Sequence, residues 1–238
     1  ILLAGAWPLV IRTYGRESGG PNGGIYRSTD SGATWEKIRG HGLPADPVGK
    51  IGIAFAESNP DVVYAMIETG APNRGVLWRS DDGGENWTLQ HEGDNTQHYT
   101  GIQFIDSLCG WVTGGRAGNI LSSSNSGEDW TRHDTAFSMN ILMDSFFLDP
   151  SQGWFCGSNG VIYRTEDGGE TFIEEESGSD QRLCSIFLLN SDVGYCVGYP
   201  YVMLRRIDDT SPWQPVDPGQ PFTLYDIYFI DELTGWST

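Results

Sequence analysis

One nine-residue phrase recurs along this chain, and its spacing constrains the fold more than any other feature. RSTDSGATW begins at Arg27 and RSDDGGENW begins at Arg79. The shared pattern is Ser or Thr, then Asp or Asn two residues later, Gly two further on and an aromatic three beyond. Four copies occur: Ser28, Asp30, Gly32, Trp35; Ser80, Asp82, Gly84, Trp87; Ser123, Asn125, Gly127, Trp130; and Thr165, Asp167, Gly169, Phe172. A fifth copy from Arg206 to Trp213 keeps Asp208 but lacks the glycine, and the aromatic positions are 52, 43, 42 and 41 residues apart.

A second motif keeps the same period. The glycine–aromatic pairs Gly110-Trp111, Gly153-Trp154, Gly194-Tyr195 and Gly235-Trp236 are 43, 41 and 41 residues apart. Each unit contains four short apolar runs separated by Asp, Gly and Ser, which predicts four strands joined by tight turns. A four-stranded repeat of about 40 to 45 residues is typical of a propeller blade.

The sequence therefore predicts an all-β fold, a β-propeller of four-stranded antiparallel blades, as one domain over residues 1–238. A blade cannot bury both its faces alone, so neighbouring blades must stack. The expected blades are residues 1–40 (partial, without its first strand), 50–91, 99–134, 140–176, 182–216 and 222–238 (partial). Because the chain opens without Met and stops inside an expected strand, TGWST, we expect an incomplete propeller cut from a longer protein.

The residue types of the phrase predict a turn rather than a ligand site. An Asp or Asn side chain accepts hydrogen bonds from backbone N–H groups just after it. The glycine supplies a positive φ, and the aromatic ring is expected to pack back between strands. Each polar group is thus expected to find its partner within the hairpin.

The phrase resembles the Asp-box, or bacterial neuraminidase repeat, of sialidases, sortilin-like domains and related propellers. The resemblance implies that the box is a structural hairpin on the outer part of the propeller, away from the ligand face. Blades 1 and 2, with SNPDVVYA from Ser58 and GVLWRSDDGGENW from Gly75, resemble sortilin-type and glycosidase-like repeat proteins. Blades 3 to 6 resemble the photosystem II assembly and stability factors and their non-photosynthetic relatives.

The composition of the chain limits the kinds of molecule and the compartments in which we expect it to act. The net charge is −18, so the surface is expected to repel nucleic acid and anionic membranes. No apolar run reaches the roughly 18 residues of a spanning helix, so direct membrane insertion is not expected. We expect a bacterial protein that is secreted, periplasmic or in the cell envelope, although Ile1–Val10 lacks the features of a signal peptide.

No metal or cofactor is expected. The four cysteines, Cys109, Cys156, Cys184 and Cys196, have no metal-ligand spacing. Cys184 and Cys196 flank a turn, so they form either a cross-strand disulfide or buried free thiols, and both alternatives stay open. His41, His91, His98 and His133 are scattered, and the acidic IEEES run (Ile173–Ser177) is expected to be a solvated outer strand.

An enzymatic reading depends on two carboxylates. Alignment of the innermost strands places Gly101, Asp144, Ser185 and Asp226 in register, so Asp144 and Asp226 are the candidates for a pair at the channel mouth. Paired carboxylates act as acid and base or nucleophile in glycoside hydrolysis. The bland alternative is a hydrated channel. A sialidase would also need an arginine triad and an R-I-P motif, which are not found, and related xyloglucan hydrolases use two propellers.

The commoner use of such a propeller is binding on the face that carries the loops between blades. Expected residues there belong to the types that contribute most to interfaces or to polar contacts: Arg74, His98, Tyr99, Arg116, Asn159, Arg182, Tyr199 and Tyr201. In the assembly factors an arginine-rich patch faces the partner, and here Arg116 and Arg182 are few for that role. We therefore expect a non-catalytic binding or assembly module for a protein or glycan partner; the alternative is a glycosidase-like hydrolase, a sialidase or a relative, using carboxylates at the channel mouth.

Overall fold

The computed structural model describes residues 1–12, 15–45, 47–56, 58–69, 74–92, 99–114, 119–133, 140–217, 219 and 223–237. Within these ranges the chain is almost entirely β-strand, with one 3₁₀ turn at Ser158–Gly160. No helix in the described part is long and apolar enough to cross a membrane. The chain divides into two compact units, residues 1–110 with 123–130 and residues 111–122 with 131–238. Each unit is described by itself.

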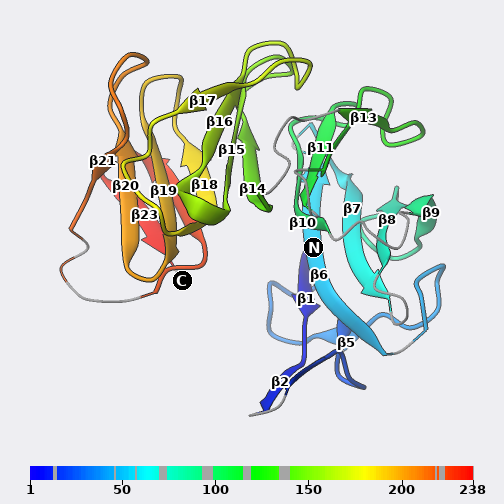
Figure 1. The fold of residues 1–238 in the computed structure, drawn as a ribbon. Coiled ribbons are helices and arrows are strands. Elements are labelled where there is room, and N and C mark those ends of the chain that lie inside the picture. The colour runs from blue at the N-terminus through cyan, green and yellow to red at the C-terminus, as the bar shows by residue number, and fades with distance from the viewer. Residues whose placement is uncertain are drawn as a thin grey trace. The chain divides into compact units, whose positions relative to one another are not determined.

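The first three sheets follow one another along the chain (Figure 1). The first is β1 (Leu2–Ala6), β4 (Gly24–Ser28) and β5 (Glu36–Lys37); the second is β6 (Val48–Ala56), β7 (Asn59–Thr69), β8 (Arg74–Ser80) and β9 (Thr88–Glu92); the third is β10 (Tyr99–Phe104), β11 (Gly110–Gly114), β12 (Asn119–Ser123) and β13 (Thr131–His133). A hairpin that the sequence analysis missed, β2 (Leu9–Arg12) and β3 (Gly15–Ser18), is inserted between β1 and β4.

The later sheets lie in the second unit. The fourth is β14 (Leu142–Phe147), β15 (Gly153–Gly157), β16 (Ile162–Thr165) and β17 (Ile173–Glu175); the fifth is β18 (Arg182–Leu188), β19 (Gly194–Tyr199), β20 (Val202–Arg206) and β21 (Gln214–Pro215); the sixth is β22 (Ile227–Asp231) and β23 (Thr234–Ser237). Strands adjacent in the chain pair antiparallel. These sheets confirm the predicted four-stranded antiparallel blades, and we refer to the six sheets as blades 1 to 6.

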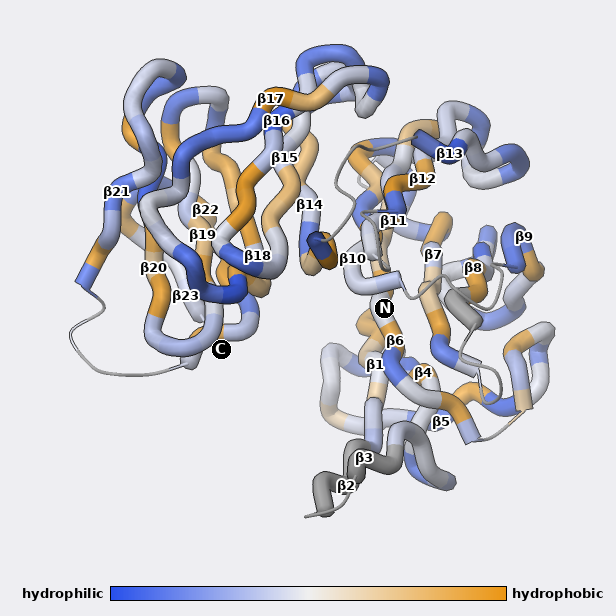
Figure 2. Tube along the Cα trace, in the orientation of Figure 1, coloured by the Kyte–Doolittle hydropathy of each residue, from blue (hydrophilic) through white to orange (hydrophobic). Residues whose placement is uncertain are grey.

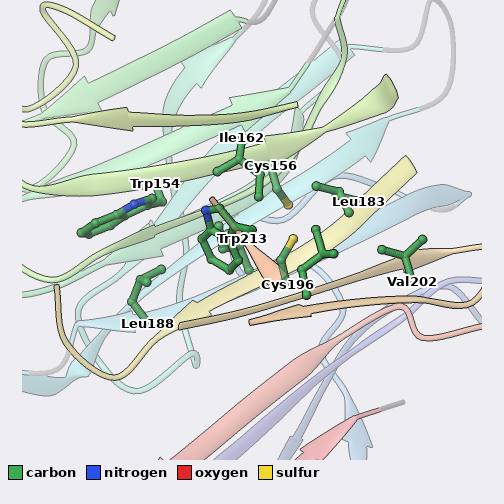
Figure 3. Close-up of a cluster of buried hydrophobic side chains, with 10 residues drawn as sticks. Trp154, Cys156, Ile162, Leu183, Leu188, Cys196, Val202 and Trp213 are labelled. Carbon is green, nitrogen blue, oxygen red and sulfur yellow. The ribbon is translucent and has the colours of Figure 1, made fainter. Parts of the chain in front are cut away.

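The core of the second unit lies between blades 4 and 5. Strand β15 is buried along its whole length, because its two faces pack against different neighbours. One face contributes Trp154 and Cys156 to an apolar cluster with Leu183, Cys196 and Trp213. Figure 3 shows the Cys156 and Cys196 side chains directed toward one another inside this cluster. Figure 2 shows that apolar residues lie in strands such as β20 and that polar residues lie in the turns.

All four cysteines are free thiols in this structure. Of the two alternatives left open by the sequence, the structure therefore has thiols at Cys184 and Cys196. The register explains why these two do not meet. Cys196 is opposite Ile186 in the ladder, and Cys184 falls at the irregularity between Leu183 and Ser185.

The Asp-boxes share one hydrogen-bonding pattern. In box 2 the Ser80 hydroxyl donates to the Asp82 carboxylate at 2.8 Å and accepts the Gly84 N–H at 2.9 Å. The same Asp82 carboxylate accepts the Asn86 N–H at 2.8 Å. Equivalent bonds occur at the other three boxes. The box glycines have φ values of 90°, 84°, 77° and 108°, a region that favours glycine.

These hydrogen bonds lower the pKa of box carboxylates. Asp167 accepts from the hydroxyl and N–H of Thr171, and these bonds lower its pKa to about 2. The ionised form is therefore favoured in the folded chain. Its contribution to stability is complete above the ordinary pKa of 3.8 and is lost as the pH falls toward about 2.

Substitution Asp167→Ala should lower the free energy of unfolding by about 1–2 kcal/mol, since two backbone and two hydroxyl partners lose their acceptor. Glu170→Ala, an exposed neighbour in the same turn, should change it by less than about 0.5 kcal/mol. Urea unfolding at pH 7 measures both. Equal effects of the two substitutions would show that the box carboxylate does not hold the turn.

The fifth box replaces its serine with an arginine, and this changes its structure. Arg206 occupies the position of Ser80 in box 2, and its side chain is only 1% exposed. Its Nη1 donates to both carboxylate oxygens of Glu175 at 2.9 Å, and its Nε donates to Ser191 O. Asp208 instead bonds to the N–H groups of Thr210 and Ser211. The box that looks decayed in sequence thus carries an ion pair across blades 4 and 5.

This ion pair corrects the prediction for the IEEES run. Ile173 and Glu174 are exposed, but the Glu175 side chain is only 12% exposed. Besides Arg206, it accepts the indole N–H groups of Trp154 at 3.3 Å and Trp213 at 2.7 Å. Alternation puts Glu175 on the opposite face of the strand from Glu174. Glu175 differs from Ile173, on its own face, because it lies opposite Ile162 at the end of β17 where Arg206 and Trp213 contact it.

Candidate functional site

The second unit gathers its candidate residues on one face. Within each blade, the start of the first strand lies beside the end of the second, as the pairings Leu142 with Gly157 and Arg182 with Tyr199 show. The turns β15–β16 and β19–β20 and the connection from β17 to β18 therefore share one end of blades 4 and 5. We call this end the turn face. The Asp-box turns lie at the opposite end of the strands.

Asp144, Ser185 and Asp226 meet at the turn face. The Ser185 Oγ lies 3.0 Å from the Asp144 Oδ2 and 3.0 Å from the Asp226 Oδ1. Asp144 also accepts the Ile186 N–H at 3.1 Å. In blades 4 and 5 a register irregularity comes just before Asp144 and Ser185 respectively, and such bulges re-aim the side chain that follows. The sequence alignment put these residues in register but did not predict that a serine bridges the carboxylates.

The bridge favours a protonated Asp144. Burial, together with the nearby charge of Asp226, raises the pKa of Asp144 to about 6, against the hydrogen bonds from Ile186 and Ser185 that lower it. A serine hydroxyl has a single hydrogen, so it can donate to only one of two carboxylates. When Asp144 is protonated it can donate to Ser185, which then donates to Asp226. A continuous chain of hydrogen bonds then joins blades 4, 5 and 6.

The distances around Ser185 also bear on whether Asp144 and Asp226 are arranged as a catalytic pair. Both lie 3.0 Å from one hydroxyl, so they are within about twice that distance of each other, close to the separation in retaining glycosidases. In those enzymes, however, the substrate lies between the carboxyls. Here Ser185, which is buried, occupies that position. The arrangement of Asp144 and Asp226 is therefore that of a structural bridge between blades.

The raised pKa predicts how stability depends on pH. Because the folded-state pKa of Asp144, about 6, exceeds the ordinary 3.8, the folded chain binds more protons between these values. Stability should thus fall as the pH rises from about 4 to about 6 and then stay level. Asp144→Asn, which mimics the protonated acid, should be about 3 kcal/mol more stable than the parent at pH 7 and equally stable near pH 4.

Urea unfolding of both proteins at pH 4 and pH 7 tests this expectation. Asp192→Asn, at an exposed position, is the matched control and should show no such pH-dependent difference. If Asp144→Asn were equally destabilising at both pH values, the carboxyl would be ionised throughout and the proposed protonation would be wrong.

Two exposed tyrosines and an arginine lie on the turn face of blade 5. Arg182 begins β18 and pairs in register with Tyr199 at the end of β19. Tyr199 and Tyr201 are 52% and 58% exposed. Tyr201 has a φ of 57°, a left-handed conformation uncommon for a residue with a side chain. We call Arg182, Tyr199 and Tyr201 the turn cluster; all three belong to the predicted ligand face.

The structure places the other predicted ligand-face residues in different surroundings. Asn159 lies in the β15–β16 turn, where its amide donates to Asn140 Oδ1 at 3.1 Å. Arg74, Tyr99, Arg182 and Tyr199 were all predicted in loops, and the structure places them at the ends of strands; Tyr99, the first residue of β10, is in addition only 6% exposed. Its tyrosine ring is buried in the blade and is not available to a partner. Arg74 begins β8, but its side chain is outside the described part, and His98 and Arg116 lie outside the described residues.

Within the described residues, no group of three or more His, Cys, Asp or Glu side chains is arranged to hold a metal ion. Two of the histidines have local partners. His41 Nδ1 lies 3.0 Å from Asn86 Oδ1, and His133 Nε2 lies 2.7 Å from the Ser122 hydroxyl.

Comparison with known proteins finds a family model and several relatives that match this chain. Residues 122–228 match the model of the photosynthesis system II assembly factor YCF48 family. The photosystem II assembly protein Ycf48 of Thermosynechococcus vestitus is 33% identical over 195 residues, 79% of this chain and 52% of that protein. The photosystem II assembly lipoprotein Ycf48 of a Nostoc strain is 22% identical over 223 residues, 89% of this chain and 61% of that protein. The chain thus spans about half the length of the curated relatives it matches.

Solved structures share the architecture. A structure of YCF48 bound to a D1 peptide superposes with a TM-score of 0.59 at 14% identity, covering 78% of this chain and 62% of that chain. The chain is an Asp-box β-propeller. A Niastella koreensis GH74 enzyme (TM-score 0.64, 19% identity, 88% of this chain, 36% of that chain) and the Hadza microbial sialidase Hz136 (0.61, 16%, 91%, 55%) have the same fold. At such identities they show the fold alone. The comparisons do not support the sortilin-type resemblance of blades 1 and 2.

Proposed function

We propose that this chain is a non-catalytic binding module that takes an extended segment of a partner protein on its turn face. The turn cluster carries this proposal. It presents two exposed tyrosines and an arginine, side-chain types that are enriched where interfaces gain most of their energy. The Ser185 hydroxyl lies 3.0 Å from both Asp144 and Asp226 at this end of the blades, and this contact between blades 4, 5 and 6 supports a face whose shape is set before a partner binds.

Similarity to the Ycf48 relatives supports a protein partner. The matched region, residues 122–228, contains the whole turn cluster. Those relatives are named photosystem II assembly proteins, and the solved YCF48 is bound to a D1 peptide. We therefore propose an assembly role of this kind, on the D1 protein or a partner segment that resembles it. Because several of the relatives are named lipoproteins, we also propose that this chain acts in the cell envelope or an exported compartment.

Titration of the chain with a labelled synthetic D1 peptide, followed by fluorescence anisotropy, tests this function. We expect saturable binding, and an excess of unlabelled peptide should reverse it. A scrambled peptide of the same composition is the control, because it keeps the charge and removes the order of side chains. Equal binding of the two peptides, or none of either, would contradict the proposed function.

A further inference from the structure

An exposed asparagine lies on the turn face of blade 4, next to the turn cluster. Asn159 is the central residue of the 3₁₀ turn Ser158–Gly160, between β15 and β16. Gly160 of this turn lies so close to the segment that leads into β18 that a Cβ on it would collide with the carbonyl oxygen of Ser179. Arg182 follows that segment as the first residue of β18. Asn159 and Arg182 therefore lie on either side of one short, exposed stretch of chain.

The backbone that carries Asn159 is held in place by the residue before it. The Ser158 N–H donates to Ile141 O at 2.9 Å, and the Ser158 hydroxyl accepts the Ile141 N–H at 2.9 Å. Asn159 itself has a φ of 61° and a ψ of 25°, a left-handed conformation that asparagine adopts more readily than most residues with a side chain. The backbone of Asn159 is thus fixed without any ligand.

The Asn159 amide is oriented by a chain of two hydrogen bonds. Its Nδ2 donates to Asn140 Oδ1 at 3.1 Å, and Asn140 Nδ2 donates to the Tyr163 hydroxyl at 3.2 Å. Tyr163 is buried in blade 4, so this chain of bonds starts from a fixed point. A side chain that is already oriented loses little conformational entropy when a partner binds.

These bonds leave one acceptor and one donor of the Asn159 amide for a partner. A primary amide has two N–H donors and an oxygen that accepts. Asn140 takes one N–H, and within the part of the chain that the structure describes, Asn159 Oδ1 accepts no hydrogen bond. The free N–H and the oxygen match the C=O and N–H groups along the backbone of an extended peptide. Such a contact does not depend on the side chains of the peptide.

We propose that Asn159 is a further binding residue of the turn face, which pairs with the main-chain N–H and C=O of the bound partner segment. The turn cluster on blade 5 contacts side chains of that segment, and Asn159 on blade 4 contacts its backbone. The aligned positions of the neighbouring repeats carry Arg116 and Pro200, so the repeat itself does not require an amide here. This inference rests on the proposed function, because it concerns the same face and the same partner.

Backbone N-methylation of the D1 peptide tests this pairing. A series of synthetic D1 peptides, each with one backbone N–H replaced by N–CH₃, is titrated against the parent chain and against Asn159→Gly. Glycine removes the amide and readily keeps the left-handed backbone, so this variant should fold as the parent does, and thermal unfolding checks that it does. Glu170→Ala is the matched control, because Glu170 lies in the box turn at the opposite end of blade 4.

For the parent chain we expect one N-methyl position at which binding weakens by about 10-fold or more. Asn159→Gly should weaken binding of the unmodified peptide about 10-fold and reduce the penalty at that position to less than about 3-fold, while Glu170→Ala should change neither. Unchanged affinity of Asn159→Gly for the unmodified peptide, no such position, or an undiminished penalty in the variant would overturn this inference and leave the proposed function standing. No saturable binding of the unmodified peptide to the parent chain would contradict the proposed function, and this inference with it.

Discussion

Replacing Glu175 with alanine is expected to lower the free energy of unfolding by about 3–5 kcal/mol, the largest effect of any single substitution proposed for this chain. The reason is that the substitution would leave the buried positive charge of Arg206 without its partner. The Arg206 guanidinium is 1% exposed and has its bidentate bond only with Glu175. Without the carboxylate, a buried arginine would lie over the Trp154 ring with no counterion. The Trp213 indole N–H would also lose its acceptor.

Glu174→Ala is the control for this experiment. It removes the same charge from the adjacent, exposed position of β17, and should change stability by less than about 0.5 kcal/mol. The double substitution Glu175→Leu with Arg206→Met removes the charges of this pair, so it should recover part of the loss, while Arg164, whose Nε lies 3.4 Å from Glu175, still loses this partner. Urea unfolding of the three variants at pH 7 measures their free energies of unfolding. A loss of equal size from Glu174→Ala and Glu175→Ala would mean that the ion pair contributes nothing to the joint between blades 4 and 5.

Replacing Tyr201 with alanine is expected to weaken binding of the D1 peptide about 30-fold or more, equivalent to about 2 kcal/mol. This prediction depends on the proposed function. Tyr201 is 58% exposed, so its removal should not cost the fold much buried area. Tyr201 lies in the short turn between β19 and β20, so the paired strands on either side hold its backbone and little conformational entropy is lost when a partner binds. Arg182→Ala should also weaken binding, and more strongly at low salt.

Tyr228→Ala is the matched control for the binding measurement. Tyr228 is 56% exposed, as Tyr201 is, but it lies on β22 outside the turn cluster. We expect its substitution to change the Kd less than 3-fold. Thermal unfolding of each variant separates a loss of binding from a loss of structure. Wild-type affinity in the Tyr201→Ala and Arg182→Ala variants, or an equal loss in Tyr228→Ala, would exclude the turn cluster as the binding surface.

The repeat made the blades predictable from sequence. A box turn is held by bonds between residues two to four positions apart, such as Ser80 with Asp82 and Asn86, so its chemistry is visible in a local pattern. The strand order follows for the same reason, since neighbours in the chain pair with one another. The inserted β2–β3 hairpin follows no repeat, and it was missed.

One prediction that failed concerns a contact between blades. Glu175 looks like part of a solvated acidic run, and only the position of Arg206, 31 residues later, makes it buried. One signal was available: Arg206 stands where the other boxes have a small hydroxyl residue, and a cation at a buried position needs an anion nearby. Tyr99 was misplaced because the beginning of a strand is poorly defined by a sequence pattern.

The candidate site was predicted in part. Alignment of the repeats placed Asp144, Ser185 and Asp226 in register, because register follows from the period alone. The bridge between them depends on bulges before Asp144 and Ser185, which no residue pattern showed. Tyr199, Tyr201 and Arg182 were chosen by residue type and by their expected position in loops of the ligand face, while their exposure came only from the structure.

The most direct test of the central claim is a hydrogen-exchange map of the full chain with and without saturating D1 peptide. We predict slower exchange of amides on the turn face of blades 4 and 5, within 158–161, 180–183 and 198–203. The Asp-box turns at the opposite end of these strands, within 166–171 and 207–212, should be unchanged. Protection confined to the box turns, or bound peptide with no protection on the turn face, would contradict the claim that this face binds the partner.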